Sequence, residues 1–256
     1  MKHKEIAKVI SQESIATGVY SMWIQTKDIA AEAVAGQFIS VYCKDGAKLL
    51  PRPISICEVN KEEGTLRIVY RVVGGGTTEM SGYVSGDDID ILGPLGNGFM
   101  QREGKKAILI GGGIGIPPMV QLGKELKNIA KVQTVAGYRD ELFLTDELEK
   151  NGDVYIATED GSTGTKGTVI DAIKACAVTG DVIYACGPTP MLRAIKEYAL
   201  ANDIECQISL EEKMACGIGA CLGCVCKSKE KDHHTNVNNK RICKDGPVFL
   251  AQEVEL

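Results

Sequence analysis

The chain has 256 residues, of which 44% are hydrophobic, and its formal net charge is −5. This length allows one large domain or two smaller domains with an appendage, and the apolar content suffices for buried cores. Acidic and basic residues are interspersed, which excludes the basic surface expected of a protein that binds nucleic acid or anionic lipid. Small molecules and other proteins are therefore the expected partners.

The N-terminus and the cysteines together predict a cytoplasmic protein. No apolar segment typical of a secretory signal follows Met1 in the first residues. The most apolar stretch, residues 107–120, is interrupted by glycines and prolines and is too short to span a bilayer, so we expect no transmembrane helix. The ten cysteines would indicate a disulfide framework only in a short secreted chain.

The first hundred residues are predicted to form short strands separated by polar turns. Apolar and polar residues alternate in segments such as Ile54-Ser55-Ile56, which is typical of strands with one buried face. No helical period intervenes, so we predict an antiparallel β-barrel over residues 1–101. The predicted strands are residues 7–10, 19–25, 38–42, 54–59, 65–72 and 89–92.

Two short motifs in this region suit phosphate binding. The run Arg52-Pro53-Ile54-Ser55 sets a guanidinium beside a hydroxyl on a strand, and an arginine can hold a phosphate through two parallel hydrogen bonds. The run Val69-Tyr70-Arg71 precedes a glycine turn that includes Gly76-Thr77, whose N–H and hydroxyl groups suit a pyrophosphate. Taken alone, an Arg-Pro on a strand more often marks an edge strand than a ligand contact, and a triple glycine is more often a mobile turn.

From Lys105 onward, strands alternate with helices. A strand at residues 107–110 leads through a glycine-rich turn to a helix at residues 119–128, which is typical of a nucleotide-binding βα unit. This alternation predicts a parallel sheet over residues 102–208, with ligands beyond the carboxyl ends of its strands. Further strands are predicted at residues 132–138, 154–158 and 182–185. The turn glycines are Gly111, Gly112, Gly113 and Gly115, and the last strand ends in Cys186-Gly187-Pro188.

Two details of this second region bear on its ligand. Cys186 is interpreted as a small packed residue, because a cysteine at a strand end before Gly-Pro is seldom a nucleophile and no histidine lies nearby in sequence. After the second strand comes Arg139-Asp140-Glu141. The two carboxylates would repel the 2′-phosphate that Arg139 could bind, so the sequence favours NAD over NADP.

Four cysteines in the C-terminal segment, residues 209–256, have the spacing of an iron–sulfur site. They are Cys216, Cys221, Cys224 and Cys243, separated by four, two and eighteen residues. This is the plant-type ferredoxin order, which holds a [2Fe–2S] cluster. Gly217 and Gly219 keep the loop small enough for backbone N–H groups to turn towards sulfur. Cys226 is a fifth thiol outside the set of four.

Zinc and disulfides are the alternatives for these thiols. His233 and His234 precede Cys243 and are potential zinc ligands. Structural zinc sites usually consist of two closely spaced Cys or Cys/His pairs separated by a longer stretch of chain, and these positions do not have that spacing. Both histidines lie in a run of charged and amide residues, so we expect them to be solvated.

In this order, the motifs resemble those of the ferredoxin–NADP reductase superfamily, in which a flavin-binding barrel precedes a nicotinamide-binding α/β domain. The resemblance covers nearly the whole chain. It implies that FAD contacts Arg52-Pro53-Ile54-Ser55, Val69-Tyr70-Arg71 and Gly76-Thr77, and that NAD contacts the turn glycines and Cys186-Gly187-Pro188.

Two features depart from that superfamily. Ile54 stands where many relatives have an aromatic residue, so stacking on the flavin would come from Tyr70 or be absent. The common C-terminal aromatic cover is also missing, and the cluster segment takes its place. Glu211, just before that segment, would either contact the flavin ring or be a solvated surface carboxylate. The solvated interpretation applies to Glu212 as well.

The cluster segment narrows the resemblance to the electron-transfer subunits of NAD-dependent, B-type dihydroorotate dehydrogenases. The resembling parts are residues 214–221 and 243–249. The resemblance implies a partner subunit that carries FMN and oxidises dihydroorotate for pyrimidine (UMP) biosynthesis. It also implies a heterotetramer with two copies of each chain. Electrons would then pass through [2Fe–2S] and FAD to NAD⁺, without a general base in this chain. Ile218, Leu222 and Val225 would form the docking surface, or would pack on the chain's own barrel.

Two other functions are compatible with the sequence. The chain could be a stand-alone NAD(P)H reductase that passes electrons to a ferredoxin or an oxygenase. It could instead be a flavin-bearing regulatory module whose cysteine segment senses oxidants or binds zinc. Iron and acid-labile sulfide analysis separates the regulatory module from both electron carriers.

Overall fold

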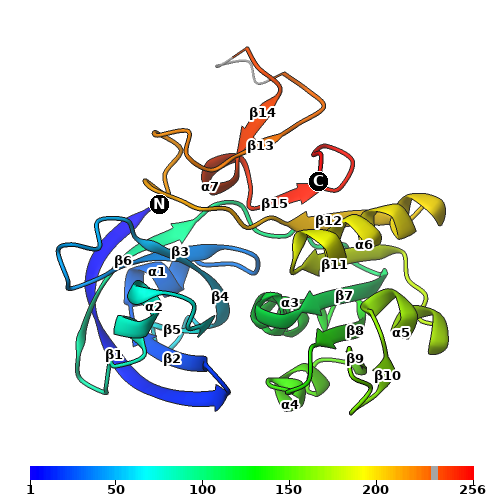
Figure 1. The fold of residues 1–256 in the computed structure, drawn as a ribbon, viewed down its shortest axis with the longest axis horizontal. Coiled ribbons are helices and arrows are strands. Elements are labelled where there is room, and N and C mark those ends of the chain that lie inside the picture. The colour runs from blue at the N-terminus through cyan, green and yellow to red at the C-terminus, as the bar shows by residue number, and fades with distance from the viewer. Residues whose placement is uncertain (232–235) are drawn as a thin grey trace.

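The structure is a computed structural model, and it describes residues 1–231 and 236–256. A barrel and an α/β domain lie side by side, and the C-terminal segment crosses over both of them (Figure 1). The predicted fold class is confirmed, because the chain forms a closed six-stranded barrel followed by a sheet that is mostly parallel.

The barrel strands are antiparallel and run in the order β1-β2-β5-β4-β3-β6. Alternate residues point into the barrel, where Ile39, Val41 and Ile68 are completely buried. The strand bounds are β1 His3–Ala16, β2 Val19–Gln25, β3 Phe38–Tyr42, β4 Arg52–Asn60, β5 Thr65–Arg71 and β6 Asp88–Leu95.

Two short helices occur in the barrel region, although the sequence shows no helical period there. Helix α1 (Lys27–Glu32) buries Ile29 and Ala30 in the barrel core, and helix α2 (Gly75–Met80) follows the glycine turn. Each helix has six residues, which is too short to establish a 3.6-residue hydrophobic period in the sequence. Their formation depends on packing against the barrel instead.

The second sheet has seven strands in the order β10-β9-β8-β7-β11-β12-β15. All neighbours are parallel except β12 and β15, which are antiparallel, so the C-terminal segment contributes the edge strand of this sheet. The bounds are β7 Lys106–Gly112, β8 Lys131–Tyr138, β9 Asp153–Thr158, β10 Thr165–Lys166, β11 Val182–Cys186, β12 Glu205–Ser209 and β15 Val248–Leu250.

Helices cover both faces of this sheet. On one face, Met119 and Leu148 come from helices α3 and α4 and pack with residues of the barrel such as Val69. On the other face, Ile173 and Ile195 come from α5 and α6 and pack with residues of the C-terminal segment. The bounds are α3 Pro117–Leu126, α4 Thr145–Glu149, α5 Val169–Ala175 and α6 Thr189–Ala201, with the 3₁₀ turn η1 at Gly113–Gly115.

The C-terminal segment is fastened to the barrel as well as to the sheet. It holds a small hairpin of β13 (Val225–Lys227) and β14 (Asn239–Arg241), and then helix α7 (Ile242–Asp245). Just beyond β6, Asn97 donates its backbone N–H to the Gly246 carbonyl at 2.6 Å and its side-chain amide to the Asp245 carbonyl at 3.0 Å. These bonds fix the end of the cysteine-bearing segment against the barrel.

A buried arginine joins the barrel to the α/β domain. The Arg67 side chain is only 8% exposed, and its Nη1 lies 3.1 Å from Glu147 Oε1 in α4. Its Nε donates to Ser21 Oγ at 2.9 Å. Charge-assisted hydrogen bonds of this kind are stronger when little water competes for them.

We predict that Arg67→Ala lowers the free energy of unfolding by about 2–3 kcal/mol, because Glu147 and Ser21 lose a buried cationic partner. Urea denaturation followed by circular dichroism measures the change. Arg139→Ala serves as the control, since the Arg139 side chain is 85% exposed and its loss should cost almost nothing. Equal stability of the two variants would contradict this assignment.

Candidate functional site

A pocket with a volume of about 570 Å³ lies between the barrel and the start of the C-terminal segment. All nine residues predicted to contact FAD line it, from β4, β5 and α2. They are Arg52, Pro53, Ile54, Ser55, Val69, Tyr70, Arg71, Gly76 and Thr77. The fold therefore brings three sequence motifs together at one cavity.

The glycine turn and the arginine are fitted to each other. A Cβ added at Gly76 would overlap the guanidinium of Arg52, so only glycine lets the arginine cross the start of α2. Thr77 Oγ1 accepts hydrogen bonds from the backbone N–H of Val73 at 2.9 Å and of Gly74 at 3.2 Å. The threonine holds the turn in place, and Arg52 supplies positive charge beside it.

Tyr70 does not present its ring for stacking, contrary to one expectation from the sequence. The residue is 1% exposed, and its ring packs in the barrel core, where it stacks on Tyr20 with centroids 6.0 Å apart. Its hydroxyl donates to Gln12 Oε1 at 2.7 Å. Interior contacts already occupy the ring, so Tyr70 remains at the pocket wall without an open aromatic face.

The C-terminal segment supplies a wall of the pocket that sequence motifs did not reveal. Met214 and Pro247 line the cavity, as do Glu211 and Glu212. Glu211 is open to the cavity but surrounded by protein, and this desolvation raises the pKa of its carboxyl. The position of Glu211 on the pocket wall supports a contact with the flavin more than a role as a solvated surface carboxylate. Contacts between distant segments leave no local signal in a sequence, so no motif predicts that Met214 and Pro247 line this pocket.

The predicted nicotinamide residues lie together at the carboxyl ends of adjacent strands. Cys186 of β11 pairs in register with Gly111 of β7, so the two glycine turns are neighbours. Cys186 is completely buried, and desolvation followed by the charge of Glu211 raises the pKa of its thiol far above the usual range. A thiol of this kind is unreactive at neutral pH, which agrees with its interpretation as a packed residue.

A second pocket of about 560 Å³ opens beside these turns. Gly113 lines it together with Arg71 of the barrel and the run Arg139-Asp140-Glu141. Glu141 accepts a hydrogen bond from the Thr17 backbone N–H at 2.9 Å, so one acidic residue is held at the rim by the barrel. Within the described residues, the linings of the two pockets do not include Gly111, Gly112, Gly115, Cys186, Gly187 or Pro188.

The four predicted metal-binding cysteines lie on one loop and the short helix α7. Backbone N–H groups point at their sulfurs: Ala220 and Cys221 donate to Cys216 Sγ at 3.3 and 3.4 Å, and Cys243 donates to Cys224 Sγ at 3.4 Å. Burial opposes ionisation of Cys216, but hydrogen bonds from the backbone N–H groups of Ile218, Cys221 and Ala220 and from the Cys221 thiol outweigh it and lower the pKa to about 6. The loop thus stabilises a thiolate before any metal binds.

The sulfurs are arranged as two pairs. Hydrogen bonding joins the thiols of Cys216 and Cys221, and those of Cys224 and Cys243. No three of these sulfurs lie within 4.8 Å of one another in the part of the chain that the structure describes. One tetrahedral zinc ion needs four sulfurs at mutual distances below about 4 Å, whereas two pairs suit two irons. The donor set therefore fits a [2Fe–2S] cluster better than zinc. His233 and His234, considered as zinc ligands, lie outside the described residues.

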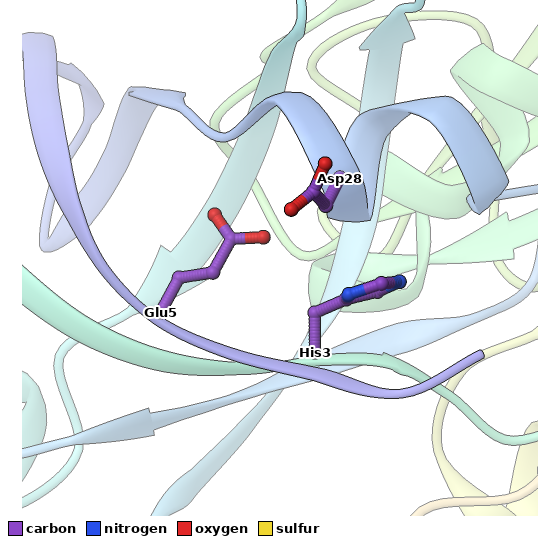
Figure 2. A group of neighbouring side chains, drawn as sticks. All are labelled: His3, Glu5 and Asp28. Carbon is purple, nitrogen blue, oxygen red and sulfur yellow. The ribbon is translucent and has the colours of Figure 1, made fainter.

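Among residues 1–231 and 236–256, one other group of metal-ligand type occurs, on the barrel, where His3, Glu5 and Asp28 have donor atoms within 4.8 Å of one another (Figure 2). These residues join β1 to the start of α1. Glu5 accepts from Thr26 Oγ1 at 2.8 Å, and His3 Nε2 lies 3.3 Å from Glu32 Oε1. These contacts give Glu5 and His3 a structural role in the barrel.

Comparison with known proteins identifies relatives along the whole chain. Residues 211–255 match the family described as the iron-sulfur cluster binding domain of dihydroorotate dehydrogenase B. The protein named dihydroorotate dehydrogenase B (NAD(+)), electron transfer subunit, from Caldanaerobacter subterraneus subsp. tengcongensis is 43% identical over 99% of both chains. The protein of the same name from Listeria monocytogenes serovar 1/2a is 47% identical, covering 97% of this chain and 98% of the relative.

Solved structures support the same architecture. A chain from the NADH-dependent reduced ferredoxin–NADP oxidoreductase structure superposes with a TM-score of 0.87 at 31% identity, covering 98% of this chain and 90% of that one. The ferredoxin reductase of carbazole 1,9a-dioxygenase shares the fold at a TM-score of 0.66 over 79% of this chain and 67% of that one, with 20% identity. No helix among the described residues is long and apolar enough to cross a membrane.

We predict that iodoacetamide modifies Cys216 of the metal-free chain faster than Cys43 at pH 7. With a pKa of about 6, Cys216 is mostly thiolate at pH 7, whereas burial raises the pKa of Cys43. The rate at Cys216 should rise from pH 5 and level off above about pH 7. Peptide mass spectrometry measures both rates, and a rate that keeps rising beyond pH 8 would contradict the lowered pKa.

Proposed function

This chain belongs to the family of dihydroorotate dehydrogenase B electron transfer subunits, and from that membership we propose that it carries electrons from a catalytic partner to NAD⁺. The partner would hold FMN and oxidise dihydroorotate in pyrimidine (UMP) biosynthesis. The route within this chain would be a [2Fe–2S] cluster followed by FAD. In the assembly we propose two copies of each chain.

One observation carries this proposal: the cysteine segment forms a wall of the predicted flavin pocket. Met214 lies two residues before Cys216, and Pro247 lies four residues after Cys243, and both line the cavity. A cluster held by these cysteines would lie beside a flavin in that pocket. Short separation is what electron transfer between the two groups requires.

Each proposed group has residues that fit it. Arg52 and the α2 turn with Thr77 would hold the FAD pyrophosphate, and Ser55 and Glu211 would lie at the pocket wall. Cys216 and Cys221 would bind one iron, and Cys224 and Cys243 the other. When bound, FAD supplies the conversion between one-electron carriers and the two-electron acceptor NAD⁺. The chain's residues bind and orient these groups, and none is required as a general base.

For NAD we propose the turn glycines at residues 111–115 and Cys186-Gly187-Pro188. They lie at the carboxyl edge of the sheet, where nucleotides bind in such folds. Asp140 and Glu141 line the adjacent pocket beside Arg139, and their charge favours NAD over NADP.

We also propose three domains, at residues 1–101, 102–208 and 209–256. We propose a cytoplasmic location, because ten free thiols suit a reducing compartment.

The proposed function is tested by mixing the loaded chain with an FMN-containing dihydroorotate dehydrogenase subunit. Dihydroorotate-dependent reduction of NAD⁺, with copurification of the two chains, is the expected result. The alternative of a stand-alone reductase predicts rapid NADH-dependent reduction of an added ferredoxin and no stable complex. That second outcome would overturn the proposal.

We predict that Gly76→Ala weakens FAD binding at least about tenfold, because the new Cβ displaces the Arg52 guanidinium. A tenfold loss corresponds to about 1.4 kcal/mol. The displaced atoms are the end of a flexible side chain, so thermal stability of the apoprotein should change little. Gly82→Ala is the control, since Gly82 lies outside the pocket lining and its Cβ would meet only the Glu79 carbonyl oxygen at 3.4 Å. Fluorescence titration with FAD measures both, and equal affinities would refute the role of this contact.

We predict that Leu222→Asp weakens assembly with the catalytic subunit at least about tenfold. Ile218, Leu222 and Val225 are 43%, 47% and 38% exposed, so they do not pack inside the chain's own barrel. Leu222 has a φ of +56°, a conformation that aspartate tolerates, so the fold should persist. Analytical ultracentrifugation measures assembly.

The control for this surface is Leu200→Asp on α6, where the leucine is 61% exposed. It adds the same charge to an apolar surface position outside the cysteine loop. If Leu222→Asp leaves assembly unchanged, or if both variants reduce it equally, the cysteine loop is not part of the docking surface.

A further inference from the structure

Ser40 occupies the outer face of the barrel beneath the C-terminal segment. It lies in the middle of β3, where Ile39 and Val41 on either side point into the barrel core. Side chains alternate along a strand, so Ser40 points outwards with Phe38. Phe38 belongs to the same buried hydrophobic cluster as Met214, Cys224 and Cys243. The outer face of β3 is therefore covered by the cysteine segment that crosses the barrel in Figure 1.

The Ser40 hydroxyl is buried without a hydrogen-bond partner. Ser40 is 0% exposed, and its Oγ has no partner among the residues that the structure describes. A buried hydroxyl without a partner is costly, and most such groups in proteins are satisfied. Ser21, another buried barrel serine, follows this rule, because its Oγ accepts from Arg67. Ser40 therefore has no acceptor among the described residues, and a group bound beside it could supply one.

The hydroxyl faces the cysteine loop. A Cβ added at Gly217 would lie 2.9 Å from Ser40 Oγ and 3.3 Å from Leu95 Cδ1. Gly217 follows Cys216 directly and has a φ of +67°, so glycine lets the loop turn closely over the serine. On the other side, the flavin pocket is lined by Phe38 and Pro53, the neighbours of Ser40, and its lining residues in the described chain do not include Ser40. The hydroxyl thus lies behind the pocket wall and against the loop.

From this position we infer that Ser40 donates a hydrogen bond to a sulfur of the [2Fe–2S] cluster, on the side held by Cys216. The inference rests on the proposed cluster. Thiolate and sulfide sulfurs carry negative charge and accept hydrogen bonds, and the cluster is the group that the loop is built to hold. Leu95 beside it supplies an apolar environment, which strengthens such a bond. Ser40 would contact the cluster directly, and it touches no substrate.

The bond would set the reduction potential of the cluster. Reduction adds one negative charge, so a donated hydrogen bond stabilises the reduced form more than the oxidised form. Loss of the hydroxyl should therefore lower the potential. We expect the equilibrium constant for reduction to fall about tenfold, which corresponds to 59 mV for one electron.

The test compares the wild-type holoprotein with Ser40→Ala and Ser40→Thr by redox titration monitored through the EPR signal of the reduced cluster. Ser40→Ala should lower the midpoint potential, and Ser40→Thr, which retains a hydroxyl, should stay closer to wild type. ENDOR spectra in H₂O and D₂O should show an exchangeable proton coupled to the cluster that Ser40→Ala alone loses. In the metal-free chain Ser40→Ala should not be destabilising, because it removes an unsatisfied hydroxyl.

Ser21→Ala is the control, since it removes a buried hydroxyl that is already satisfied; it should lower stability and leave the potential unchanged. An unchanged potential and an unchanged exchangeable coupling in Ser40→Ala would overturn the inference while the cluster remains in place. If Ser40→Ala loads no cluster, a Ser40→Thr protein with wild-type potential and coupling supports the inference, and one with a lowered potential overturns it. A wild-type chain without a [2Fe–2S] signal would instead refute the proposed function.

Discussion

Residues 209–256 must contact the barrel and the α/β sheet at the same time, and the predicted flavin pocket and the cysteine loop both depend on this double contact. Strand β15 pairs with β12 at the sheet edge, while Asn97 binds the backbone of Asp245 and Gly246 from the barrel side. Met214 and Pro247, which belong to this segment, lie on the pocket wall. A shift of the segment would therefore change the pocket and the cysteine loop together.

The distribution of polar groups matches a protein that positions carriers and does little acid–base chemistry of its own. Arg52 is placed where an anion can bind, and Cys216 is stabilised as a thiolate by backbone N–H groups. Cys186, in contrast, is a buried thiol with a strongly raised pKa and no evident reactivity. The side chains that matter most act through charge and hydrogen bonds on bound groups, which explains why the chain needs few histidines.

The parts of this architecture that depend on local pattern were predictable from sequence. Alternation identified the barrel strands, and the change to strand and helix identified the second sheet. Cysteine spacing grouped the four thiols that the fold places on one loop and helix α7. Other features depend on contacts between distant segments: the burial of the Tyr70 ring against Tyr20, the addition of β15 to the second sheet, and the approach of Gly217 to Ser40. The residues that neighbour these positions in sequence do not predict these contacts, because strand register and side-chain packing depend on the whole folded chain.

The central claim is that one polypeptide connects a nicotinamide, a flavin and an iron–sulfur cluster, and an anaerobic NADH titration of the purified chain tests it most directly. Absorption follows the flavin, and EPR of frozen samples follows the cluster. The predicted result is bleaching of the flavin together with the signal of a reduced [2Fe–2S] cluster. Bleaching without that signal, with zinc present and acid-labile sulfide absent, would contradict the claim.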